Sequence, residues 1–140
     1  MDAAFEIVAP AIRRVAAESS VKLHEFFRDD PVWRLNFTRE QGGEAMVDVT
    51  WSEETPDTYR VTATWWLDDY DSTLRSQRSE AIGEFKRDQP PEDLETLIRR
   101  GIETIEAWSP ADLTEKLGPY PDWQRYSTRE EFGKNRLPRR

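Results

Sequence analysis

Residues 32–67 read VWRLNFTREQGGEAMVDVTWSEETPDTYRVTATWWL, and this stretch decides the fold. Apolar side chains alternate with polar ones in three runs, at 33–37, 45–51 and 59–67. Alternation with a period of two is typical of strands that are buried on one face. Two short breaks, at Gly42-Gly43 and at 53–57, separate the runs and suit hairpin turns. The stretch therefore predicts a three-stranded antiparallel meander with one apolar face and one polar face.

Amphipathic helices are predicted on both sides of the meander. Apolar residues at steps of three and four run through residues 5–27, and Asp29-Asp30-Pro31 ends that pattern. Pro90-Pro91 and the two acids that follow are typical of a helix start, and residues 92–108 carry a second apolar stripe. We expect both helices to cover the apolar face of the sheet.

The remaining stretches complete the predicted architecture. Residues 68–88 are expected to form a partly ordered acidic loop that leads into a short helix, although an extended fourth strand also fits them. Ser109 is expected to begin another short helix, and a last helical turn is expected to end near Phe132. The predicted fold class is α+β: a two-layer sandwich with an N-terminal helix, a three-stranded antiparallel meander, and two or three C-terminal helices packed on one sheet face. We expect one domain over 1–123 and a basic, partly ordered tail over 124–140.

The charge of the chain is negative and uneven. Its 140 residues carry 28 acidic and 20 basic side chains, a net charge of −8. Residues 1–123 hold 26 acids against 14 bases, a net of −12, whereas residues 124–140 hold two acids against six bases, a net of +4. An acidic body repels phosphate backbones, which argues against nucleic-acid binding by the body and favours a basic protein partner.

Composition also bears on the compartment. No apolar run is long enough to span a membrane, and the N-terminal residues lack the basic start and the apolar core of a signal peptide. The chain has no cysteine, which excludes disulfides and thiolate chemistry. We expect a cytoplasmic protein that does not enter a membrane. The sequence predicts no oligomeric state.

The residue types that catalysis and metal binding need are scarce. Asp68-Asp69-Tyr70-Asp71 is the densest acidic cluster, but Leu74 stands where a calcium loop starting at Asp69 would need glycine. His24 is the single histidine, and it falls on the polar side of the predicted first helix. We therefore predict no metal site, no cofactor and no catalytic residue, and we lean towards a protein that is not an enzyme.

The polar face of the meander is the predicted binding surface. Trp65 belongs to the apolar series, so its neighbour Trp66 must point to the polar face, where an exposed tryptophan would be typical of an interface. Alternatively, residues 68–88 fold back over Trp66. The predicted partner-binding residues are Trp66, Arg34, Asp48, Thr62, Thr64, Asp68, Asp69 and Asp71.

Two functions from different classes follow. The first is a non-enzymatic, acidic protein-binding domain that neutralises or escorts a basic protein; many small immunity proteins, antitoxins and secretion chaperones share this size, acidity and composition. The alternative is a small-ligand-binding or hydrolase domain with an aromatic pocket between the sheet and the 92–108 helix. Its lining would be Trp33, Trp51, Trp65 and Trp108, although the same four residues could simply form the core.

Overall fold

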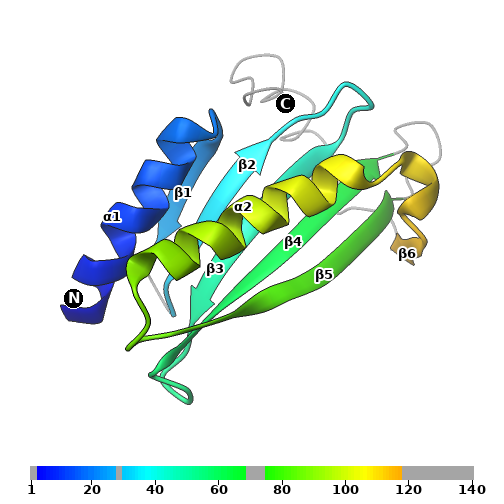
Figure 1. Cartoon of the computed structure of the whole chain (residues 1–140). Helices are drawn as coiled ribbons and strands as arrows, with labels where there is room; N and C mark the ends of the chain where they lie inside the picture. The colour runs from blue at the N-terminus through cyan, green and yellow to red at the C-terminus, as the bar shows by residue number, and fades with distance from the viewer. Residues whose placement is uncertain (1–2, 28–29, 69–74, 118–140) are drawn as a thin grey trace.

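The computed structural model of the chain describes residues 3–27, 30–68 and 75–117 (Figure 1). Within these ranges the chain forms a helix, five strands, a second helix, one 3₁₀ turn and a short last strand. The bounds are α1 (Ala3–Glu18), β1 (Lys22–Phe26), β2 (Val32–Phe37), β3 (Glu44–Trp51), β4 (Thr58–Asp68), β5 (Arg75–Lys86), α2 (Pro91–Ala107), η1 (Pro110–Asp112) and β6 (Glu115–Leu117).

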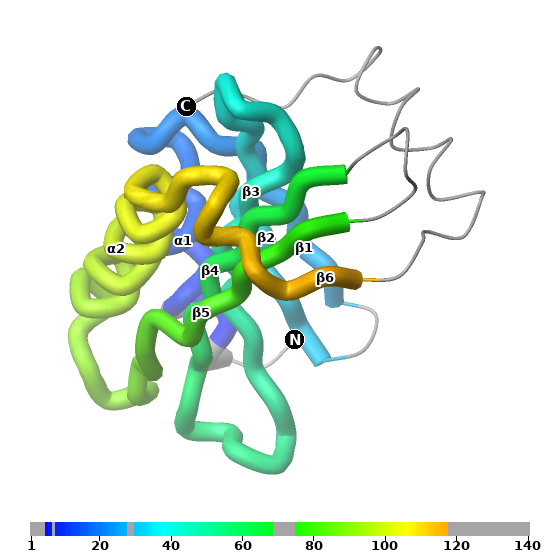
Figure 2. The backbone as a smooth tube through the Cα atoms, turned by 90° about the vertical axis from the view of Figure 1, so that its right-hand side faces the viewer, coloured from blue at the N-terminus to red at the C-terminus, as the bar shows by residue number. Residues whose placement is uncertain are grey.

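The six described strands form one antiparallel sheet in which the strand order follows the chain from β1 to β6. Both helices lie on the same side of the sheet: α2 runs across β3, β4 and β5, and α1 lies beside α2 towards β1 (Figure 1). Figure 2 shows the two layers from another side, with the helices on one side of the strands. The architecture is α+β, with both described helices on one face.

The predicted fold class is wrong in its numbers of strands and helices. The three runs of 32–67 do form strands, as β2, β3 and β4, but the sheet has six strands and the described ranges hold two α-helices. The additional strands come from stretches that the sequence pattern assigned to helices or loops. Long-range pairing outweighs local pattern in each case.

The first helix ends at Glu18, well before residue 27. Ser20 adopts a φ of 54°, in the left-handed region that commonly ends a helix. The backbone N–H of Val21 donates to the carbonyl oxygen of Ala16 at 3.2 Å, and the chain then reverses into β1, which pairs with β2. The apolar residues beyond Ser20 match the helical spacing but belong to this strand.

The stretch 68–88 contains a strand where we predicted a loop and a helix. β5 pairs with β4 along its whole length, with one irregularity opposite Val61 and Thr62. Gly83 weakens a helix, yet here it allows close packing, because a Cβ at this position would lie 2.8 Å from Cδ2 of Leu97 on α2. The alternative of an extended fourth strand is therefore confirmed for residues 75–86.

The C-terminal region agrees with the sequence in part. α2 spans Pro91–Ala107, with proline at its start and acids in its first turn. The short helix expected from Ser109 is only the 3₁₀ turn η1, where Asp112 Oδ2 accepts the Ser109 backbone N–H at 2.7 Å, and β6 follows. The predicted turn near Phe132 and the basic tail 124–140 lie outside the described residues, and the single domain over 1–123 stays a prediction.

The core lies between the sheet and the helices. Alternate residues of β2, β3 and β4 point towards the helices with no exposed surface, which confirms the predicted apolar side of residues 32–67. Burial of this apolar area is the main force that holds the two layers together. The fully buried positions of these strands are Trp33, Leu35, Phe37, Ala45, Val47, Val49, Tyr59, Val61, Ala63 and Trp65.

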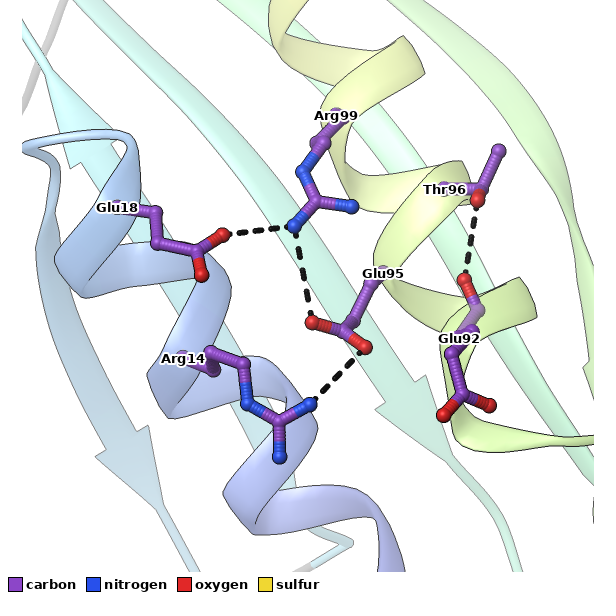
Figure 3. A network of polar contacts seen from close by, with 6 residues as sticks. All are labelled: Arg14, Glu18, Glu92, Glu95, Thr96 and Arg99. Carbon is purple, nitrogen blue, oxygen red and sulfur yellow. Dashed lines mark hydrogen bonds and ion pairs between the residues drawn. The ribbon is translucent and has the colours of Figure 1, made fainter.

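Charged side chains join the two helices above this core (Figure 3). The carboxylate of Glu95 on α2 is only 4% exposed and lies 3.3 Å from Nη1 of Arg14 on α1. Its other oxygen lies 3.7 Å from Nη2 of Arg99, and the same nitrogen lies 2.8 Å from Glu18 Oε2. The network connects α1 to α2 at a site where apolar packing is interrupted.

Candidate protein-binding face

The face of the sheet turned away from α1 and α2 carries polar side chains on neighbouring strands. Side chains alternate between the two faces along a strand, so the residues next to the buried series point to this side. We call this surface the polar face. Its members on the first four strands include Lys22, His24, Phe26, Arg34, Asn36, Glu44, Met46, Asp48, Thr62, Thr64 and Trp66.

Arg34 and Asp48 form the best-defined polar pair on this face. They are opposite each other on β2 and β3, and Nε and Nη2 of Arg34 donate to the two oxygens of Asp48 at 2.8 and 3.0 Å. These hydrogen bonds raise the pKa of Arg34 above its ordinary value. A two-pronged ion pair of this kind fixes the guanidinium in one orientation.

Phe26 is an exposed aromatic residue beside this pair. Its side chain is 48% exposed, and Cζ of Arg34 lies 5.8 Å from its ring centroid. The ring of His24 stacks on Phe26 with centroids 6.1 Å apart and an interplanar angle of 14°. We call Phe26, His24 and Arg34 the Phe26 corner. It presents apolar area on side chains whose positions are restricted by their neighbours.

His24 is neutral over a wider pH range than an ordinary histidine. Burial lowers its pKa, and the positive charges of Lys22 and Arg34 lower the pKa further. The uncharged imidazole stacks on Phe26 without adding a third cation to this part of the face. The location of His24 also differs from the prediction, because it lies on the strand β1 and on the polar face rather than on a helix.

Glu44 lies in a second polar contact of the same face. Its Oε1 accepts a hydrogen bond from Nδ2 of Asn36 at 2.6 Å. Burial raises the pKa of Glu44, Arg34 opposes this effect, and Asp48 adds to it. The polar face thus contains one carboxylate whose charged form is disfavoured by its surroundings.

The structure buries the central residue of the predicted site. Trp66 points to the polar face as expected, but it is only 7% exposed, and Cζ of Arg75 lies 5.7 Å from its ring centroid. Arg75 belongs to the stretch 68–88, and because residues 69–74 lie outside the described residues, the alternative in which this stretch folds back over Trp66 stays a prediction. Trp66 does not offer the exposed ring that an interface anchor needs.

The other predicted binding residues divide into three groups. Arg34, Asp48 and Thr62 lie in one row across β2, β3 and β4, and Thr64 lies in the next row, where its hydroxyl is 2.9 Å from that of Ser79. Asp68 is the last residue of β4, opposite Arg75. Asp69 and Asp71 lie outside the described residues.

Phe26 was missed because it was assigned to a helix stripe. Within residues 22–26 only Leu23 and Phe26 are apolar, and Glu25 points to the helix side, where Arg13 pairs with it at 2.8 Å. Alternation is therefore absent from this strand. The signal that could have indicated Phe26 is the adjacent pair Phe26-Phe27. Neighbouring residues of an extended chain point to opposite faces, so one of the two rings must lie away from the core. Phe27 packs on the buried Trp33, and Phe26 lies on the polar face.

The four tryptophans of the alternative pocket contribute to the core. Trp33 and Trp65 have no exposed surface and Trp108 is almost fully buried, while Trp51 is half-buried against Phe5, with ring centroids 5.2 Å apart. Two surface hollows are lined by described residues, at 55–58 with 86–88 and at 77–79 with 111–115, and no tryptophan lines either. These observations do not favour an aromatic ligand site.

Two acidic turns that are far apart in sequence meet at one end of the sheet. The backbone N–H of Arg87 donates to the carbonyl oxygen of Asp57 at 2.9 Å, which joins the β3–β4 turn to the segment before α2. A hollow of about 830 Å³ lies between the two turns. Asp57 and Asp88 line it together with Lys86 and Arg87, and the two turns also carry the exposed carboxylates Glu53, Glu54, Glu92 and Asp93.

Three further observations concern metal binding, membrane spans and similarity to known proteins. Among the described residues, no group of three or more histidine, aspartate or glutamate side chains is placed to hold a metal ion. None of the described helices combines the length and the apolar character needed to cross a membrane. Comparisons with protein-family models, curated proteins and solved structures gave no match.

Proposed function

We propose that this chain is a non-enzymatic protein-binding domain that recognises a basic protein partner through the Phe26 corner of the polar face of its sheet. The partner would be a protein that this domain neutralises or escorts, and the cytoplasm is the compartment we propose for the interaction. The exposed Phe26 ring, held between His24 and Arg34, is the observation that carries the proposal.

The Phe26 corner has the composition and the rigidity of an interface anchor. Aromatic residues and arginine are enriched where binding energy concentrates, and most charged residues are depleted there. Arg34 is already fixed by Asp48, so little side-chain entropy is lost when a partner covers it. Phe26 and Phe27 are the large apolar side chains that the described residues expose most, and only Phe26 lies on the polar face.

The charge of the chain supports a basic partner. The net charge of −8 attracts positively charged proteins over a distance of about one Debye length, roughly 8–10 Å at physiological salt. The acidic turns around 53–57 and 88–93 place much of this charge at one end of the sheet. Such charge mainly accelerates association, whereas the buried anchor determines how long the complex lasts.

The test is affinity capture from native lysate with three forms of the protein. Wild type is compared with Phe26→Ala, which removes the proposed anchor, and with Phe27→Ala, which removes a neighbouring ring that packs on Trp33. We expect a basic protein that wild type and Phe27→Ala retain and that Phe26→Ala loses. Binding of that purified protein should weaken by about tenfold or more in Phe26→Ala, the range of an anchor residue that costs over 1 kcal/mol.

Two results would contradict the proposal. One is the capture of no protein by wild type at low salt with gentle washing. The other is a captured partner that is acidic, or that binds Phe26→Ala and wild type equally well. Thermal unfolding of each variant shows whether a loss of binding reflects the missing ring or a loss of folded protein.

A further inference from the structure

The outer edge of β5 is largely unpaired. β4 pairs with β5 along its full length, but β6 pairs only with residues 75–77 on the other side. Within residues 3–27, 30–68 and 75–117, no strand pairs with the outer side of Arg78–Lys86. Ser79, Ala81 and Glu84 on this segment are exposed, so the edge is accessible from solvent.

The direction of the backbone groups at this edge follows from two hydrogen bonds. The N–H of Arg87 donates inwards, to the carbonyl oxygen of Asp57 at 2.9 Å. The N–H of Lys86 donates outwards, to Oε1 of Gln89 at 2.6 Å. Backbone groups alternate in direction along an antiparallel strand, so the N–H and carbonyl of Glu84 also point outwards. Outward groups of this kind are what an added strand binds.

A hollow of about 490 Å³ opens where β6 stops pairing with β5. It leaves space for a second chain to enter beside Ser79. Along the edge itself Glu80 pairs with Arg78 at 3.8 Å and Glu84 pairs with Lys86 at 3.3 Å. The acidic excess lies at the hollow, where Asp112 and Glu115 favour a basic segment.

We propose that the outer edge of β5, from Arg78 to Lys86, binds an extended basic segment of a partner protein as an additional strand. Main-chain hydrogen bonds supply affinity in this mode, and the acidic side chains select the charge of the segment. The edge lies on the opposite side of the sheet from β1 and Phe26, so this surface is separate from the Phe26 corner.

The experiment uses a display library of short random peptides and three forms of the full chain. Glu84→Pro removes the outward N–H, whereas Glu84→Ala removes the same side chain and keeps the N–H. Proline is tolerated at such a position because no bond of the sheet is lost. We expect enriched peptides with several Lys or Arg residues that bind Glu84→Pro about tenfold more weakly, or worse, than they bind Glu84→Ala, which lacks the same side chain but keeps the N–H. Phe26→Ala should bind these peptides as wild type does, which separates this test from that of the proposed function.

Folding of Glu84→Pro is checked by circular dichroism. If it does not fold, hydrogen exchange on wild type replaces it: a bound peptide should slow exchange of the Glu84 amide. The proposal is overturned if no peptide is enriched, if the peptides bind Glu84→Pro as tightly as wild type, or if the Glu84 amide is not protected. It is also overturned if sedimentation shows wild type self-associating in a way that Glu84→Pro abolishes, because a second copy would then occupy the edge.

Discussion

Cζ of Arg39 lies 4.2 Å from the ring centroid of Trp65, and this cation–aromatic contact is almost completely buried. The guanidinium also donates to the backbone carbonyl oxygens of Trp108 at 2.7 Å and of Glu106 at 3.1 Å. These carbonyls belong to the C-terminal end of α2, whose last groups have no partner within the helix. Arg39 therefore connects the loop after β2 to the end of α2 through the core face of β4.

We predict that Arg39→Ala destabilises the fold by about 2–4 kcal/mol. The substitution removes the contact with Trp65 and leaves two carbonyl oxygens without their donor. Arg39→Lys should recover only part of this loss, because an ammonium group cannot stack as a planar guanidinium does. Urea unfolding measures both variants, and a loss below about 0.5 kcal/mol for Arg39→Ala would show that water replaces the donor without cost.

Trp65 and Trp66 test how deeply each face of β4 is buried. The hypothesis of an exposed Trp66 implied that Trp66→Ala would cost little stability. Because Trp66 is 7% exposed, we now expect Trp66→Ala to cost more than about 1 kcal/mol, and Trp65→Ala to cost about 3–5 kcal/mol. Thermal melts of the two variants measure these losses. A melting temperature of Trp66→Ala equal to that of wild type would support the hypothesis that Trp66 is exposed.

The sequence predicts only those strands whose apolar positions alternate. β2, β3 and β4 have their helix-facing positions filled almost entirely by apolar residues, so the period of two is clear. β5 instead has Arg78 and Glu80 opposite Trp65 and Ala63, because this strand lies near the edge, where charged side chains reach solvent. Only the pairing with β4, which no local pattern contains, specifies it as a strand.

Only part of the candidate site could be predicted from the sequence. Arg34 and Asp48 were both assigned to the polar face because the alternation within their strands gives the direction of each side chain. Phe26 could not be placed there, since its position on the polar face depends on the chain reversal at Ser20. Sequence patterns give the direction of a side chain within a strand, but its exposure depends on which segments pack around it.

The Glu95 network predicts an order of effects. Glu95 is buried, whereas the side chains of Arg14 and Arg99 are 55% and 44% exposed and remain hydrated when their partner is lost. Glu95→Gln should therefore cost no more than about 1 kcal/mol. The double variant Arg14→Ala with Arg99→Ala should cost more, because it leaves a buried carboxylate without a cation. Urea unfolding of both proteins is the measurement, and the reverse order would mean that the arginines contribute only through exposed contacts.

Glu44 makes stability depend on pH. Burial raises its pKa in the folded chain above the unfolded value. Between these two values the folded chain binds more protons than the unfolded one, so the free energy of unfolding falls as pH rises through that window. Glu44→Gln, whose amide oxygen can still accept from Asn36, should then be more stable than wild type at pH 7. The gain should vanish below about pH 3, where Glu44 is protonated in both states.

The control for Glu44 is Glu40→Gln, which makes the same change of charge at an exposed position. We expect no comparable gain in the free energy of unfolding of Glu40→Gln at pH 7. An equal gain in both variants would indicate a general effect of net charge, and the burial of Glu44 would then not be its cause.

Gly42 and Gly43 provide the sharpest comparison of two neighbouring positions. Both have positive φ, 100° and 73°, so alanine is strained at either one, by about 1–3 kcal/mol. They differ in the space that a Cβ would meet. At Gly42 the nearest atom outside its chain neighbours is Cδ2 of Leu67 at 3.9 Å, an ordinary contact, whereas at Gly43 the Cβ would overlap the carbonyl oxygen of Trp66.

We therefore expect Gly42→Ala to lower the free energy of unfolding by the strain alone. Gly43→Ala should lower it by several kcal/mol more, because the backbone of β4 must move and disturb the pairing of Glu44 with Trp66. Denaturant unfolding of the two variants gives the comparison, and equal losses would show that β4 yields at this turn without cost.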